Sequence, residues 1–277
     1  MKVAINGFGR IGRLVLRAIL ENRRSDIDVV AINDLGSIAD NAHLFKYDSV
    51  HGPFPGTVEV LSDGLKINGH TIKVFANPDP ASLPWKDLGI DVAMECSGRF
   101  TKRDDAGKHL TAGAKKVLIS APAEGADLTV VWGVNHKELK PEHLIVSNAS
   151  CTTNCLAPIA YILNKTIGIK HGFMTTIHSY TGDQNLVDTL HTDLRRARAA
   201  ALSLIPASTG AAKAVGLVLP ELKGKLDGTA VRVPTANVSL VDLTFEANRP
   251  TTQAQINKVI AEAAETPAPS RTAPLPA

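Results

Sequence analysis

The chain has 277 residues, which is long enough for two domains, or one large one, with a substantial core. Hydrophobic residues make up 44% of it and its mean hydropathy is +0.02, as in ordinary globular proteins. No apolar run approaches the roughly 18–20 residues that span a bilayer, and the N-terminus lacks the apolar segment of a signal peptide. These features predict a cytoplasmic protein without a membrane partner.

Charge and cysteine content exclude further classes of protein. Charged residues make up 21% of the chain, the net charge is +3, and no Lys/Arg run indicates a nucleic-acid partner. The three cysteines, Cys96, Cys151 and Cys155, have neither the spacing of a zinc site nor that of a disulfide framework. The histidines show no ligand spacing either, so no metal is expected. Small anionic ligands remain open, since they need only a few well-placed cations.

Predicted strands and helices alternate in the first half of the chain. Strands are expected at residues 2–6, 28–33, 90–96, 116–120, 128–132 and 144–147, with two more at 65–75 around an Asn68-Gly69 turn. Helices are expected at residues 10–21 and 103–112. This alternation predicts a doubly wound, largely parallel sheet in a first domain of residues 1–150.

The pattern changes after residue 150. A helix at residues 152–164 precedes strands at 172–178, 229–233 and 238–245, which predict a mostly antiparallel α+β domain over residues 151–265. Residues 266–277 are rich in Pro and Ala and are expected to form a disordered end. The predicted fold class is therefore α/β, with a doubly wound domain followed by a mostly antiparallel one.

A glycine-rich run, GFGRIG at residues 7–12, directly follows the first strand and opens the first helix. In that context Gly7 permits a tight turn, Gly9 lets the backbone approach a pyrophosphate, and Gly12 lets helix and strand pack closely. Asp34 follows the second strand, where its carboxylate suits both ribose hydroxyls and repels a 2′-phosphate, which favours NAD over NADP. A purely structural glycine turn, with Asp34 as a strand-end cap, is the alternative.

A second run, SNASCTTNC at residues 147–155, places Cys151 in the first turn of a helix, where the helix dipole stabilises a thiolate. Considered alone, such a cysteine is more often structural, and Cys155, one turn further on, is expected to be a small buried residue. A nucleophile needs a base, and His178, which closes a strand before a polar loop, is the best candidate. A hydrogen-bonded structural histidine is the alternative for His178. The arginines at positions 195, 196, 198 and 232 are by themselves typical of a solvated surface.

Six runs together resemble the phosphorylating glyceraldehyde-3-phosphate dehydrogenases: NGFGRIGR, SNASCTTNCLAP, TIHSYTGDQ, LRRARAAA, IPASTGAAKAVG and VRVPTANVSLVDL. The similarity extends in consistent order from residue 1 to about residue 265. It implies an NAD-binding Rossmann domain and a catalytic domain, in a homotetramer of glycolysis and gluconeogenesis. It also implies the reaction, an NAD-dependent oxidation of D-glyceraldehyde 3-phosphate with inorganic phosphate to 1,3-bisphosphoglycerate.

The resemblance assigns roles to individual residues. Cys151 is implied to be the nucleophile that attacks the aldehyde, and His178 the base that activates the thiol and assists hydride transfer. The attacking phosphate is implied to contact Ser150, Thr152, Thr209 and Gly210. The C3 phosphate is implied to contact Thr181, Arg232 and one arginine of the 195–198 cluster, for which we choose Arg196 although spacing does not separate it from its neighbours. The cofactor is implied to contact Gly7, Gly9, Arg10, Ile11, Gly12, Asp34, Pro78 and Ser120.

Three departures from the family pattern keep alternatives open. Pro78 stands where the family commonly has an arginine beside the adenine, and Thr189-Leu190 replaces a Leu-Pro pair associated with NAD selectivity. Beyond residue 265 the family continues through further strands, a C-terminal helix and a nicotinamide-binding asparagine, whereas this chain ends in TPAPSRTAPLPA. One alternative is therefore an inactive or unstable NAD-binding derivative. The other is erythrose-4-phosphate dehydrogenase, which alters the phosphate-site residues that this chain keeps at Thr181 and in STGAA, residues 208–212.

Overall fold

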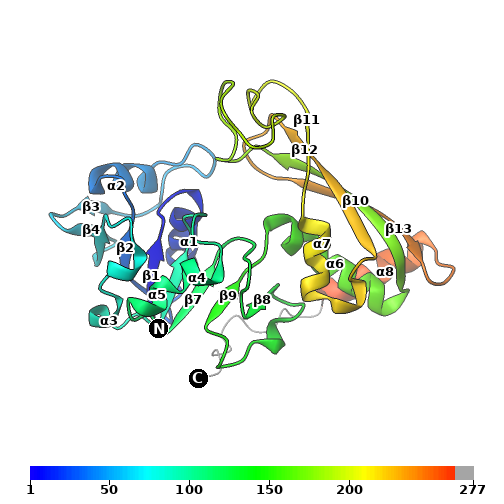
Figure 1. Cartoon of the computed structure of the whole chain (residues 1–277), viewed down its shortest axis with the longest axis horizontal. Helices are drawn as coiled ribbons and strands as arrows, with labels where there is room; N and C mark the ends of the chain where they lie inside the picture. Colours follow the sequence, from blue (N-terminus) through cyan, green and yellow to red (C-terminus); the bar gives the residue numbers. More distant parts are fainter. Residues whose placement is uncertain (266–277) are drawn as a thin grey trace. The chain divides into compact units, whose positions relative to one another are not determined.

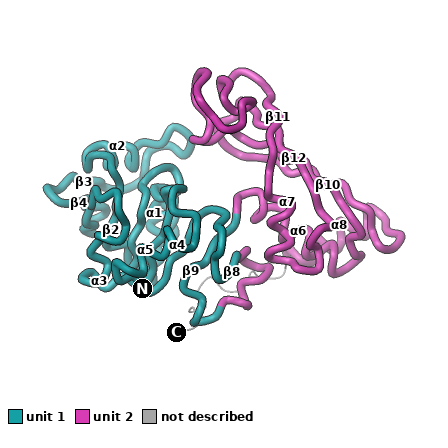
Figure 2. Tube along the Cα trace, viewed as in Figure 1, with its two compact units in different colours: residues 1–129, 140–149 teal, residues 130–139, 150–277 magenta. Residues whose placement is uncertain are grey.

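The computed structural model describes residues 1–265. The segment at residues 266–277, for which a disordered end is predicted, lies outside the described residues. The chain divides into two compact units, shown in Figure 2. The first contains residues 1–129 and 140–149, and the second contains residues 130–139 and the described chain from Ser150 onwards.

A nine-stranded sheet forms the centre of the first unit, with the strand order β3-β4-β5-β2-β1-β6-β7-β9-β8 (Figure 1). The strands that neighbour one another from β5 to β8 are all parallel, which confirms the predicted doubly wound sheet. The antiparallel hairpin predicted around Asn68-Gly69 is also present, as β4 and β5. The strands are β1 (Lys2–Asn6), β2 (Asp28–Asn33), β3 (Val58–Val60), β4 (Gly64–Ile67), β5 (His70–Phe75), β6 (Val92–Glu95), β7 (Lys116–Ile119), β8 (Leu128–Thr129) and β9 (Ile145–Ser147).

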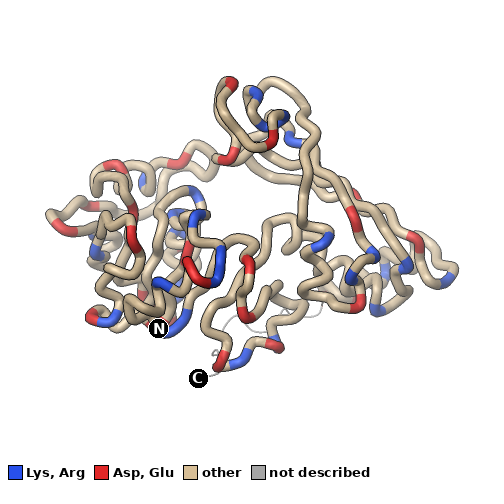
Figure 3. Tube along the Cα trace, in the orientation of Figure 1, with Lys and Arg blue, Asp and Glu red and all other residues tan. Residues whose placement is uncertain are grey.

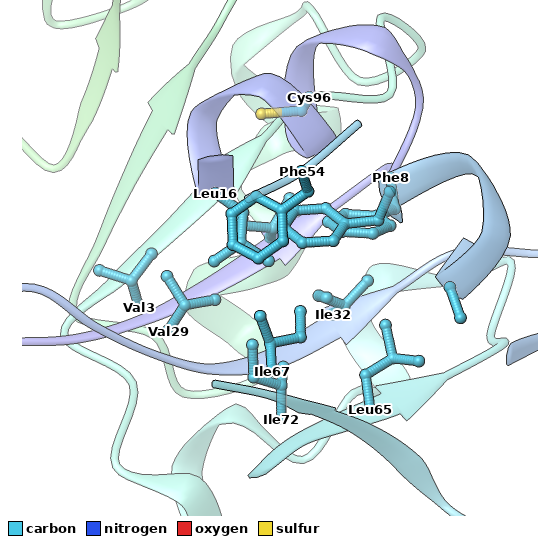
Figure 4. Packing of buried hydrophobic residues seen from close by; sticks show 13 residues of the cluster. Val3, Phe8, Leu16, Val29, Ile32, Phe54, Leu65, Ile67, Ile72 and Cys96 are labelled. Atoms are coloured by element: carbon cyan, nitrogen blue, oxygen red, sulfur yellow. The ribbon is translucent and has the colours of Figure 1, made fainter. Parts of the chain in front are cut away.

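Helix α1 (Arg10–Glu21) has the bounds predicted from the sequence and packs its apolar side against this sheet. Figure 4 shows Leu16 of α1 together with Phe8 and the strand residues Val3, Val29 and Ile32 in one cluster of buried side chains. Full burial of each such side chain stabilises the fold by about 1.5–3 kcal/mol. This packing holds the glycine turn before α1 against the ends of β1 and β2.

The remaining helices of the first unit are short. The single helix predicted at residues 103–112 is wrong in detail, because the chain forms α4 (Arg103–Ala106) and α5 (Lys108–Thr111) on either side of Gly107. A glycine weakens the middle of a helix, which explains the division there. The other elements are α2 (Ile38–Lys46), which the sequence analysis did not predict, α3 (Trp85–Leu88) and the 3₁₀ turn η1 (Pro80–Ser82).

The second unit contains a four-stranded sheet with the order β11-β12-β10-β13. Only the central pair is parallel, so the predicted mostly antiparallel sheet is confirmed. Helix α6 packs against α7 and α8, neither of which the sequence analysis predicted. The elements are η2 (His136–Glu138), α6 (Cys151–Thr166), β10 (Ile169–Ser179), β11 (Ile205–Ala207), α7 (Ala211–Val218), η3 (Pro220–Leu222), β12 (Leu226–Val233), β13 (Leu240–Ala247) and α8 (Gln253–Glu265).

Charged residues are spread over both units, with acidic and basic positions interspersed along the chain (Figure 3). Many of them form ion pairs with charged residues close in space, as Arg24 does with Asp26 and Lys170 with Glu246. Within residues 1–265, no helix has both the length and the apolar character needed to cross a membrane.

Candidate active site

Cys151 is the first residue of α6. The preceding residue, Ser150, caps the helix: its hydroxyl accepts a hydrogen bond from the Thr153 amide at 3.0 Å. A side-chain oxygen in this position satisfies one of the amide groups that a helix leaves unpaired at its start. The thiol therefore lies at the positive end of the helix dipole, and it is exposed to solvent.

The imidazole of His178 faces this thiol. His178 Nε2 lies 3.3 Å from Cys151 Sγ, although 27 residues separate the two in sequence. The hydrogen bond from His178, helped by bonds from Thr152, lowers the pKa of the Cys151 thiol to about 7. The same bond, together with one to the Ser179 carbonyl, raises the pKa of His178. The pair therefore favours a thiolate beside an imidazolium near neutral pH.

The other ring nitrogen fixes the orientation of the imidazole. His178 Nδ1 lies 2.7 Å from the Ser179 carbonyl oxygen, which can only accept, so Nδ1 carries a proton. Arg232 lies 3.3 Å from the same nitrogen, and since both groups are donors this contact is electrostatic rather than a hydrogen bond. Arg232 instead donates to the Ser179 carbonyl at 2.9 Å and to the Thr181 hydroxyl at 3.3 Å.

The parallel pairing of β10 with β12 brings Arg232 to this place. In that register His178 lies opposite Arg232, so two residues far apart in sequence become neighbours. Burial lowers the pKa of Arg232, and the nearby positive charge of Arg196 lowers it further. The guanidinium groups of Arg196 and Arg232 lie close enough to repel each other, and the Thr181 hydroxyl lies beside Arg232. This arrangement suits the binding of a multiply charged anion.

Among the clustered arginines, Arg196 differs from its neighbours. Its guanidinium is largely buried and donates to Asp183 at 2.9 Å and to the Ser208 carbonyl at 2.8 Å. Arg195 forms an exposed two-pronged pair with Asp193, and Arg198 an exposed pair with Asp188. Burial of its side chain thus distinguishes Arg196 from Arg195 and Arg198, which the spacing in the sequence could not do.

The residues implied to hold the attacking phosphate occur at two helix starts. Ser150 and Thr152 flank the thiol at the start of α6. Gly210 precedes the first residue of α7, and the Thr209 hydroxyl accepts a hydrogen bond from the Ala211 amide at 3.2 Å. Amides at helix starts bind anions readily.

In the first unit, a cavity of about 290 Å³ opens at the carboxyl ends of β1 and β2. Four of the residues predicted to bind the cofactor line it: Gly7, Gly9, Asp34 and Pro78. Asp34 is held in place by the amides of Phe8 and Gly36, at 2.8 Å and 2.9 Å. Ligands of doubly wound sheets bind at this edge, so the position suits a dinucleotide.

The other predicted cofactor residues lie outside the lining of this cavity. Arg10 pairs with Asp48 at 2.6 Å, Ile11 is exposed on the first turn of α1, and Ser120 bonds to the Cys96 thiol. Gly12 is buried, where any Cβ would overlap the Gly7 carbonyl oxygen. Asn6 and Asn33 directly precede Gly7 and Asp34 in sequence, which is a signal for their place in this cavity. Eight lining residues were not predicted from the sequence: Asn6, Asn33, Leu35, Asn77, Cys96, Ser97, Arg99 and Phe100.

Gly7 and Gly9 provide a matched test of this turn. Gly7 has φ +89°, and a Cβ there would lie 2.5–2.8 Å from the Cys96–Ser97 backbone. We expect Gly7→Ala to lower the free energy of unfolding by about 2–4 kcal/mol, measured in urea. Gly9 has φ −70° and nothing within 4 Å of a Cβ, so Gly9→Ala should leave unfolding unchanged while weakening NAD binding. Equal loss of stability in both variants would contradict these separate roles.

A larger cavity, of about 490 Å³, lies at the opposite ends of the strands, beneath the C-terminal part of α1. Leu16, Ile67 and Ile72 are among its apolar lining residues, and His70 and Asp28, which pair at 3.1 Å, are among the polar ones. Within the described residues 1–265, no three His, Cys, Asp or Glu side chains lie together so as to hold a metal ion.

Comparison with known proteins identifies the family of both units. The profile of the glyceraldehyde 3-phosphate dehydrogenase NAD binding domain matches residues 1–103, and that of the C-terminal domain matches residues 150–272. The glyceraldehyde-3-phosphate dehydrogenase of Xanthobacter flavus is 67% identical over 264 residues, which cover 95% of this chain and 79% of the relative. That of Cereibacter sphaeroides is 63% identical with the same coverage, and that of Geobacillus stearothermophilus 58% identical over 96% of this chain and 79% of the relative. The chain therefore belongs to the glyceraldehyde-3-phosphate dehydrogenase family.

Proposed function

We propose that this chain oxidises D-glyceraldehyde 3-phosphate with NAD and inorganic phosphate to 1,3-bisphosphoglycerate. The observation that supports this most directly is the pair of Cys151 and His178, at 3.3 Å, at the start of α6. Membership of the family supports NAD as the cofactor and an oxidoreductase activity. The matches favour neither of the alternatives, an inactive derivative or an erythrose-4-phosphate dehydrogenase.

The proposed reaction passes through a thioester on Cys151. The thiolate adds to the aldehyde carbon, and His178 gives a proton to the oxygen of the hemithioacetal, then takes it back as hydride leaves for the nicotinamide. The products of this step are NADH and an acyl group bound to sulfur. A phosphate oxygen then attacks the thioester carbon, and the sulfur leaves as the thiolate that the His178 bond stabilises.

We assign the C3 phosphate of the substrate to Thr181, Arg196 and Arg232, and the attacking phosphate to Ser150, Thr152, Thr209 and Gly210. The second set provides hydroxyls and helix-start amides, which suit a phosphate that must also react. For the cofactor we assign Gly7, Gly9, Arg10, Ile11, Gly12, Asp34, Pro78 and Ser120. The negative charge of Asp34 at the cavity wall favours NAD over a 2′-phosphorylated cofactor.

Arg196→Ala tests the substrate assignment. Loss of one charge-assisted hydrogen bond to phosphate should raise the KM for glyceraldehyde 3-phosphate about 10- to 100-fold in steady-state kinetics. Arg195→Ala is the matched control, because its exposed pair with Asp193 points to a surface role, and its KM should stay within about twofold of the original. The assignment fails if the two variants have the same KM.

We further propose a cytoplasmic homotetramer. The loop between β10 and β11 exposes a set of apolar side chains at 67–98% of their full area: Leu186, Val187, Leu190, Leu194, Leu202 and Leu204. Apolar groups gathered on an exposed loop indicate a surface that another chain covers. Sedimentation analysis tests this proposal, and a purely monomeric species would contradict it.

The proposed function is tested by following NADH absorbance with purified protein, glyceraldehyde 3-phosphate and NAD, with and without inorganic phosphate. Sustained turnover that depends on phosphate is expected. Erythrose 4-phosphate serves as the control substrate and should react more slowly at equal concentration. Faster turnover of erythrose 4-phosphate, or no turnover by folded protein, would overturn the proposal.

A further inference from the structure

A buried carboxylate lies directly behind the cavity around Gly7, outside the residues assigned above. Glu95, the last residue of β6, is 1% exposed; His109, which it contacts, and Trp85, which contacts the far side of His109, are fully buried. Glu95 Oε2 lies 2.6 Å from Asn6 Nδ2 and 3.0 Å from His109 Nε2. Glu95 Oε1 accepts from the Ser97 amide at 2.8 Å and from the Ser97 hydroxyl. A carboxylate so thoroughly buried needs such partners.

The partners of Glu95 are all hydrogen-bond donors. Two of them, His109 and Ser97, must donate to Glu95 because they already accept hydrogen bonds from other groups. Trp85 Nε1 can only donate, and it lies 3.0 Å from His109 Nδ1. Nδ1 is therefore the acceptor of the ring, and the proton is on Nε2, which faces Glu95. The Ser97 hydroxyl accepts from the Arg99 amide at 3.1 Å, which leaves its proton for Glu95.

On the cavity side, the side-chain amides of Asn33 and Asn6 are oriented by their hydrogen bonds in the same way. Asn33 is fixed by the backbone of Asn77: its oxygen accepts from the Asn77 amide at 2.9 Å, and its nitrogen donates to the Asn77 carbonyl at 2.9 Å. Asn33 Nδ2 also donates to Asn6 Oδ1 at 2.7 Å. The nitrogen of Asn6 is thereby turned towards Glu95, which must accept.

These bonded groups form part of the cavity wall. Asn6, Asn33, Asn77 and Ser97 all line it, whereas Glu95, His109 and Trp85 lie behind the wall. A neutral amide at position 95 has only one oxygen that can accept hydrogen bonds. Its NH₂ group would face either the donors of Ser97 or those of Asn6 and His109. Only an anionic acceptor satisfies all four donors at once.

We propose that Glu95 is a positioning residue for NAD: its buried carboxylate, held from behind by His109 and Trp85, sets the orientation of Asn6, Asn33 and Ser97 in the dinucleotide cavity. It acts through these residues and not through contact with the cofactor. This inference rests on the proposed cofactor site. It explains why an acidic side chain is kept fully buried at the end of a central strand.

Glu95→Gln tests the inference with almost no change in shape. We expect the Kd for NAD, measured by titration calorimetry, to rise about tenfold, the equivalent of one hydrogen bond to a charged group. The Kd for AMP, which carries only the adenosine half of the cofactor, should rise in parallel. The kcat at saturating NAD should stay within about twofold, because the groups that react are in the other unit.

Three further variants separate positioning from general stability. Asp91→Asn changes the acid that directly precedes β6, where Asp91 pairs with exposed Lys115, and should leave NAD affinity unchanged. His109→Gln can still donate to Glu95 and accept from Trp85, so its affinity should be close to the original. His109→Leu removes the donor and should weaken NAD binding about threefold, which keeps the test available if Glu95→Gln does not fold.

The outcomes separate this inference from the proposed cofactor site. If the unaltered protein does not bind NAD, the cofactor site itself is wrong. If it binds NAD, and folded Glu95→Gln or His109→Leu binds equally well, the positioning role is wrong. A lower melting temperature with unchanged Kd would show that the network is structural only, and would also overturn the inference.

Discussion

Replacing Cys151 by serine is expected to abolish phosphate-dependent NADH formation, with kcat lowered at least about 10³-fold. The thiol pKa of about 7 provides a large thiolate fraction at neutral pH, whereas a serine hydroxyl stays protonated there. Serine also forms an oxygen ester, which transfers its acyl group to phosphate less readily than a thioester does. Steady-state rates with saturating NAD, substrate and phosphate measure the effect.

Two controls accompany this variant. Cys155→Ser changes the cysteine one turn further along α6, which is exposed rather than buried as predicted, and should keep nearly full activity. Cys151→Ser itself should bind NAD with unchanged affinity, because every residue lining the dinucleotide cavity belongs to the first unit. A Cys151→Ser enzyme with a near-original rate would remove this residue from the mechanism.

Much of the fold could be predicted because local rules and the tertiary structure agree. Strands and helices alternate in residues 1–150, and the sequence pattern shows this order. Helix α1 begins after the glycine turn and ends with its apolar pattern, as predicted. Element boundaries were less predictable where packing decides them. The strand expected at residues 128–132 contains only β8 (Leu128–Thr129), and the helix at 103–112 divides at Gly107.

The candidate site could be predicted only in part. The thiol at a helix start follows from sequence, since Ser150 is a capping residue. Its pairing with His178 does not, because the approach of the two side chains depends on tertiary packing across 27 residues. The resemblance to a family supplied that pairing, and the register of β10 and β12 then explains the place of Arg232.

The buried network around Glu95 could not be predicted at all. A glutamate within the apolar strand at residues 90–96 gives no sign of its partners, which come from residues 6, 97 and 109. Hydrogen bonds between strands and a distant helix depend on the sheet order, in which β1 lies beside β6. Sequence patterns describe which face of a strand is apolar, but not which polar groups meet at its end.

The ionisation of the Cys151–His178 pair follows from the directions of two pKa shifts. The thiol loses its proton above about pH 7, and the imidazole, whose pKa is raised, holds its charge to a higher pH than an ordinary histidine. The thiolate is therefore stabilised by an adjacent positive charge in the neutral range. Raising the pH removes the imidazolium, and lowering it protonates the thiolate.

Replacing His178 by asparagine is expected to lower kcat about 10²- to 10⁴-fold, the usual effect of losing a general base. Because the bond from His178 is the largest cause of the lowered thiol pKa, that pKa should return from about 7 towards 9.0, and the rising limb of the pH–rate profile should move upward with it. The pH dependence of Cys151 alkylation by iodoacetamide, resolved by peptide mass spectrometry, measures the thiol directly. His171→Asn is the matched control, because His171 lies on the same strand but pairs with Glu246 at the surface. An alkylation midpoint that is the same in His178→Asn and His171→Asn would contradict the proposed pairing, since only the first variant removes the group that faces the thiol.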